Sequence, residues 1–156
     1  MDRILRLLVA ACFVWFSATA VASAQTSTIE TPIAVTLVNQ CTGESIFIDG
    51  TMTTLIGLTA DASGGLHATL ETKSRGTGVA SSGTKYVFSE TFVSQLNTAG
   101  SSGSVTLTQV LTHNLITAGK TQNAYIRIRL RVTLNASGEV TATVDQFEAG
   151  CRGSTR

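Results

Sequence analysis

Residues 124–134 read AYIRIRLRVTL and alternate without a break between apolar and polar side chains. One parity holds the apolar residues Ala124, Ile126, Ile128, Leu130, Val132 and Leu134. The other parity holds Tyr125, Arg127, Arg129, Arg131 and Thr133. A period of two is typical of a β-strand with one buried face, whereas a helical period would scatter the arginines around the axis. We therefore predict a strand whose apolar side chains point inward and whose arginines point outward.

The residues that follow predict a hairpin. Residues 135–139 (NASGE) have the composition of a turn, and an alternating segment begins after them. If apolar residues face each other across this turn, Leu134 lies opposite Val140 and Arg129 lies opposite Asp145. The inward residues of the second strand are then Val140, Ala142 and Val144.

The rest of the chain carries further alternating segments with glycine-bearing turns. They predict strands over 33–38, 45–59, 66–73, 85–96 and 104–116. Pro32 precedes the first of these, where no backbone N–H is needed, and Gly50 marks a bulge or a corner in the second. A Gly/Ser/Thr-rich loop is predicted over 74–83. Seven to eight long strands with short connections predict an all-β fold in which a single antiparallel meander closes into a β-barrel. The alternative is a β-sandwich, in which strands are shorter and crossovers longer.

The first 24 residues predict a signal peptide. A short charged start precedes an almost wholly apolar stretch over 7–22, and Ala22-Ser23-Ala24 has the small-x-small form of a signal-peptidase site. Cleavage after Ala24 leaves one domain over 25–156 in a secreted or periplasmic protein. A lipoprotein cut before Cys12 is the alternative. An uncleaved anchor is disfavoured because the apolar core is shorter than the roughly 20 residues that a bilayer requires.

The net charge disfavours partners that are recognised by bulk charge. Eleven Lys and Arg less Arg3 and Arg6 leaves nine, and ten Asp and Glu less Asp2 leaves nine, so the cleaved chain is formally neutral. Bulk charge therefore gives no reason to expect a nucleic acid or an anionic membrane as partner.

Two cysteines remain after cleavage, Cys41 near the start of the domain and Cys151 near its end. In an exported chain we expect a disulfide between them, and an up-and-down meander places both at the same pole. This bond would close a loop of roughly 110 residues, a contribution of about 4 to 5 kcal/mol in the chain-entropy model. Two free thiols or a metal pair are the alternative.

Two groups of polar side chains are candidates for binding. The first group is the row Arg127, Arg129 and Arg131, whose neighbouring guanidinia lie about 6.5 Å apart on a strand and could hold an acidic ligand. The preferred interpretation is that these arginines form a solvated face with cross-strand partners. The second group shares the inward parity of two paired strands and consists of Tyr86, Glu90, Gln109 and His113. We expect Glu90 and His113 to lie within a residue or two of each other, as an acid–base pair, a structural hydrogen bond or the lining of a ligand pocket.

No motif in the chain indicates a metal or a cofactor. Neither histidine has a second His or Cys at strand spacing, as a zinc site would need. No nucleophile elbow is present, and Gly76-Thr77-Gly78 is not followed by the helix that a phosphate-binding loop requires.

Four short motifs add a resemblance. NQCTGE at 39–44, GTKY at 83–86, NASGEV at 135–140 and Cys151-Arg152 resemble, in order and spacing, an uncharacterised family of small exported bacterial β proteins. The resemblance spans nearly the whole chain after residue 24 and implies the β fold and bacterial export. Because its motifs are mostly turns and the cysteine pair, it implies no activity and no catalytic residue.

Three functions fit these observations. The first is a non-enzymatic exported barrel that binds a small apolar or amphipathic ligand or a partner surface. The second is an isomerase or cyclase that uses Glu90 and His113 as base and acid, with Tyr86 orienting the substrate. The third is an outer-membrane barrel, which ranks last because only six aromatic residues remain after cleavage, too few for two girdles. The sequence sets neither the ligand nor the oligomeric state.

Overall fold

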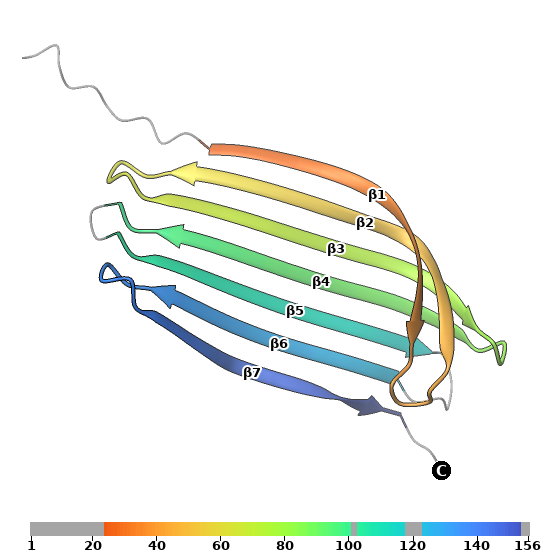
Figure 1. Cartoon of the computed structure of the whole chain (residues 1–156). Helices are drawn as coiled ribbons and strands as arrows, with labels where there is room; N and C mark the ends of the chain where they lie inside the picture. Colours follow the sequence, from red (N-terminus) through yellow and green to blue (C-terminus); the bar gives the residue numbers. More distant parts are fainter. Residues whose placement is uncertain (1–23, 101–102, 118–122, 154–156) are drawn as a thin grey trace, which may run out of the picture.

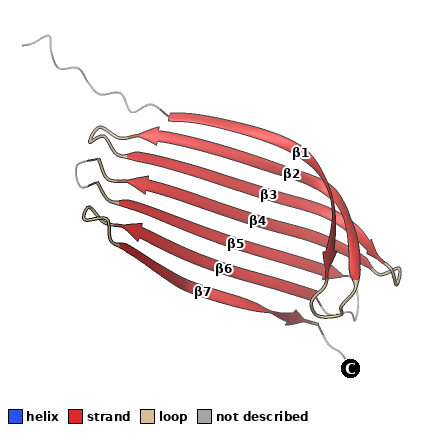
Figure 2. Ribbon diagram, in the orientation of Figure 1, coloured by secondary structure: helices blue, strands red, loops and turns tan. Residues whose placement is uncertain are grey.

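The computed structural model describes residues 24–100, 103–117 and 123–153, and these form one antiparallel sheet in which every strand pairs with the next along the chain (Figures 1 and 2). The seven strands are β1 (Ala24–Val38), β2 (Ser45–Ala60), β3 (Leu66–Ala80), β4 (Lys85–Thr98), β5 (Val105–Thr117), β6 (Asn123–Leu134) and β7 (Val140–Arg152). The predicted meander is confirmed, and the described residues form no second sheet of the kind that a sandwich requires.

The sheet is curved but open, with β1 and β7 as its unpaired edges. The predicted closure into a barrel is therefore not seen among the described residues. A disulfide between Cys41 and Cys151, with Cα atoms 5.8 Å apart, joins the β1–β2 turn to the end of β7, as predicted. We call this end of the sheet the disulfide pole and the other end the open pole.

At the disulfide pole β1 and β2 curve across the sheet (Figure 1). β2 keeps one continuous register with β3, so Gly50 is a corner and not a bulge. Gly50 faces Gly76, and a Cβ added to Gly50 would lie only 2.6 Å from the Cα of Gly76. Close approach of two backbones is what requires glycine here.

Two predicted boundaries are wrong. Residues 74–80 belong to β3 and not to a loop, because Gly76 and Gly78 make room for β2; a Cβ on Gly78 would lie 2.8 Å from the Cγ2 of Ile46. β1 begins at Ala24 and includes Pro32 in its interior. An edge strand tolerates proline because one of its sides has no strand to bond.

The core lies at the disulfide pole, where the curved ends of β1 and β2 cover strands β4 and β5. Its buried hydrophobic residues are Ile46, Ile48, Ala80, Tyr86, Phe88 and Leu115. The register places all six on one face of the sheet, which also carries the predicted inward residues of β6. We call this the inner face. The three arginines of β6 are exposed on the opposite, outer face, as predicted.

The β6–β7 hairpin departs from the predicted register at one point. Leu134 pairs with Val140 as predicted, but Arg129 lies opposite Gln146 and not Asp145. A bulge between Arg129 and Leu130 leaves Asp145 as the extra residue of β7. Beyond the bulge the inner face of β7 therefore continues with Phe147, which pairs with Ile128.

Candidate ligand site on the inner face

A polar row crosses the inner face at its middle. Ser74 of β3 pairs with Glu90 of β4, which in turn pairs with His113 of β5. The His113 Nδ1 lies 3.0 Å from the Glu90 Oε2, and both side chains are partly buried. The predicted proximity of Glu90 and His113 is confirmed, while their role remains a prediction.

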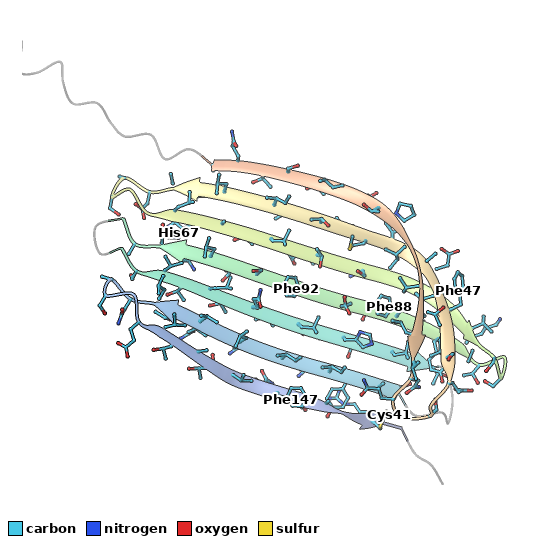
Figure 3. The ribbon with its side chains drawn as sticks, in the orientation of Figure 1. Cys41, Phe47, His67, Phe88, Phe92 and Phe147 are labelled. Carbon is cyan, nitrogen blue, oxygen red and sulfur yellow. A yellow bond between two sulfur atoms is a disulfide. The ribbon has the colours of Figure 1, made fainter. Side chains whose placement is uncertain are left out.

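The Glu90–His113 pair sits among aromatic rings. The imidazole of His113 packs edge-to-face against Phe88, with ring centroids 5.3 Å apart. Phe88 and Phe92 precede and follow Glu90 by two residues on β4 and so share its face (Figure 3). When Glu90 is a carboxylate it accepts in this bond and Nδ1 of His113 donates; Nε2 accepts when the imidazole is neutral and donates when it is protonated. No described residue forms a hydrogen bond with Nε2.

A pocket of about 210 Å³ lies between His113 and the disulfide. Its walls include Cys41, Cys151, Ala124, Ile126 and Ala149. The lining is mixed: Gln40, Tyr125 and His113 contribute polar groups beside the apolar walls. The pocket therefore connects the polar row to the apolar disulfide pole.

The inner face carries few charged side chains. Among the residues that pair in the register, Glu90 and His113 are the only carboxylate and imidazole on this face, and it holds no lysine or arginine. The bulge residue Asp145 is not assigned to either face by the register. The charged side chains of the outer face include the arginine row, Lys73 and Glu71. Among the paired residues of the inner face, Glu90 is therefore the one acidic side chain.

The other two predicted ligand residues lie apart from this pair. Gln109 is four residues from His113 toward the open pole, opposite Ser94. Tyr86 lies at the disulfide pole, where its side chain is 1% exposed. Its hydroxyl donates to Glu44 Oε2 at 2.7 Å and accepts from Asn39 Nδ2 at 3.3 Å. Tyr86 thus anchors the β1–β2 turn.

Hydrogen bonds at the β1–β2 turn shift the pKa values of Glu44 and Tyr86. Bonds from the hydroxyls of Ser82 and Tyr86 lower the pKa of Glu44, and burial together with the Glu44 bond raises the pKa of Tyr86. Asn39 Oδ1 accepts the backbone N–H of Cys41 at 2.9 Å and so holds the turn that carries the cysteine. Sequence reasoning gave Asn39 and Glu44 no role, although both belong to the NQCTGE motif.

The arginine row stands open to solvent on the outer face. Arg127 lies opposite Glu148, which accepts a hydrogen bond from Tyr125 Oη at 3.2 Å. None of the ion pairs between described residues includes an arginine of this row. Its use as a site for an acidic ligand remains a prediction.

The described ranges contain neither a cluster of metal-ligating side chains nor a membrane-spanning helix. No three His, Cys, Asp or Glu residues there gather as a metal site would require. No helix in these ranges is long and apolar enough to cross a membrane.

Comparisons of the chain with protein-family models, curated proteins and solved structures find no match. The resemblance based on the turn motifs therefore stays a prediction.

Proposed function

We propose that this protein is an exported, non-enzymatic binding protein whose inner face receives a small apolar or amphipathic ligand. The observation that carries this proposal is the uncovered apolar surface of that face. Ten large hydrophobic residues of the inner face are between 36% and 70% exposed: Ile29, Val35, Ile56, Leu58, Leu66, Leu70, Leu134, Val140, Val144 and Phe147.

Such a surface favours a bound molecule for energetic reasons. Apolar area gains about 25 cal/mol for each Å² removed from water, and only the disulfide pole is covered by the chain itself. Contiguous exposed apolar surface in a soluble protein marks a binding site. A ligand on the inner face would extend the core from the disulfide pole toward the open pole.

Closure of the sheet around a ligand, by approach of its two edges without strand pairing between them, forms part of this proposal. The disulfide holds the β1–β2 turn against the end of β7, while the edges are free of each other elsewhere. Approach of β1 toward β7 would enclose a ligand lying on the inner face. The enzymatic alternative has less support, because Tyr86 binds Glu44 and does not face Glu90 and His113.

Export is supported by the disulfide, which is compatible with an extracellular or periplasmic location. The signal peptide and its cut after Ala24 are proposed on the sequence alone, since residues 1–23 lie outside the described ranges.

A neutral fluorescent apolar probe tests the proposal. We expect N-phenylnaphthylamine to bind the oxidised exported protein saturably, and Ile56→Asp to weaken binding about tenfold or more. Ile116→Asp is the matched control, because Ile116 lies on the outer face and is 47% exposed against 44% for Ile56. Absence of saturable binding, or equal loss in both variants, would overturn the proposal.

A further inference from the structure

The inner face has the charge pattern of a site for a cation with a hydrocarbon tail. We infer that the ligand is a long-chain alkylamine, whose ammonium group binds at Glu90 and His113 and whose tail lies along the apolar inner face. This inference rests on the proposed function and adds the chemical class of the ligand.

Hydrogen-bonding capacity at the polar row supports an ammonium group. Glu90 as a carboxylate only accepts hydrogen bonds, and its Oε2 lies 3.0 Å from Nδ1 of His113. A ligand that complements this carboxylate must bring donors. An ammonium brings three donors and a positive charge, and a charge-assisted bond is stronger than a neutral one.

The same pattern disfavours an acidic head group. A carboxylate or phosphate at this place would meet Glu90, and no lysine or arginine of the inner face could compensate it. The arginine row cannot serve, because Arg127, Arg129 and Arg131 lie on the outer face of β6. Like charges on an apolar face repel more strongly than in water.

Aromatic rings supply a second interaction for a cation. Phe88 and Phe92 flank Glu90 on the same face of β4, and Phe88 also contacts the imidazole of His113. A cation near the face of a phenyl ring gains from the ring quadrupole, and this gain grows when water is excluded. Phe88 is buried in the core, so the partly exposed Phe92 is the ring that an ammonium drawn to Glu90 would contact.

Room for a tail exists on both sides of the polar row. Toward the disulfide pole, the pocket of about 210 Å³ begins at His113 and is walled by Ala124 and Ile126. Toward the open pole, Leu111 and Leu107 follow on the inner face of β5. From His113 to the start of β5 the strand runs roughly 26 Å, room for an extended alkyl chain.

Three ligands of equal chain length separate the contribution of the head-group charge to binding from that of the alkyl tail. Dodecylamine, dodecanol and dodecanoate are each titrated, as monomers, against the protein carrying bound N-phenylnaphthylamine at about pH 8, where the amine is still protonated. We expect dodecylamine to displace the probe at a concentration about tenfold lower than dodecanol, and dodecanoate to displace it least.

The Glu90→Gln variant tests whether the preference for dodecylamine over dodecanol arises at Glu90. It keeps the shape of the side chain and removes its charge, so the advantage of dodecylamine over dodecanol should disappear while dodecanol binds as before. Glu71→Gln is the matched control, because Glu71 is a carboxylate on the outer face of β3. That variant should keep the full advantage of the amine.

The outcomes separate the two proposals. If the probe binds but dodecanoate or dodecanol displaces it as well as dodecylamine does, the amine inference is overturned and the proposed function stands. If the probe does not bind at all, the proposed function fails first. An amine preference that survives Glu90→Gln would also overturn the inference. The comparison on the natural protein decides the point even where Glu90→Gln lowers stability.

Discussion

The disulfide gives the most direct test of how the open sheet is stabilised. Replacing both Cys41 and Cys151 with alanine removes a link between residues 110 positions apart in the sequence. In the chain-entropy model, releasing a loop of this length lowers the free energy of unfolding by about 4.8 kcal/mol at 25 °C. Marginally stable domains have a total of about 5 to 15 kcal/mol, so the loss is a large fraction.

Urea unfolding of the oxidised protein, the reduced protein and the double alanine variant measures this quantity. Reduced protein and variant should unfold at the same, much lower midpoint, and reductant should not affect the variant further. The bond also holds the curved ends of β1 and β2 over Ile46 and Ile48, so its loss should expose the core at the disulfide pole. A difference in unfolding free energy below about 1 kcal/mol would refute this reasoning.

Three further predictions concern the core, the outer face and acid stability. Ile48→Ala should cost about 2 to 5 kcal/mol in urea unfolding because Ile48 is fully buried, whereas Ile56→Ala, on the same face and strand but 44% exposed, should cost clearly less. Arg129→Ala should change the unfolding free energy by less than about 1 kcal/mol; a loss as large as that of Ile48→Ala would contradict the exposure of the arginine row. Hydrogen bonds from Ser63 and Gly65 lower the pKa of Asp61 from 3.8 to about 2, so the contribution of its carboxylate to the free energy of unfolding is present above pH 3.8 and is lost as the pH falls toward 2. Asp61→Asn should flatten the dependence of the unfolding free energy on pH in this range. An unchanged dependence would contradict the lowered pKa.

Alternation determined most of what the sequence could predict. The eleven residues of 124–134 fix which side chains share a face, and the sheet places them accordingly. The same reasoning brought Glu90 and His113 together, because both lie on inward parities of strands joined by a short turn. Parity is a local property, and it carries over directly into the cross-strand neighbours of a meander.

Composition gave a wrong boundary for β3 because glycine occurs both in turns and where two strands approach closely. Gly76 and Gly78 were assigned to a loop because glycine is frequent in turns, yet here they leave space for the corner of β2. The bulge of β7 did leave a signal in the sequence. Apolar residues occupy even positions up to Val144 and odd positions from Phe147 onward, and such a change of parity within one strand indicates an extra residue.

Whether the sheet closes depends on its two edges, which alternation does not describe. Pro32 lies within β1 and has no N–H to offer a further strand, and the bulge at Asp145 interrupts the ladder of β7. Proline and bulges are devices that keep edge strands from pairing. With both edges made poor partners and joined only through the disulfide, the inner face stays accessible along most of its length. An apolar face that the chain does not seal by continuous strand pairing would suit the proposed ligand, because that ligand could enter between β1 and β7 without breaking a strand ladder.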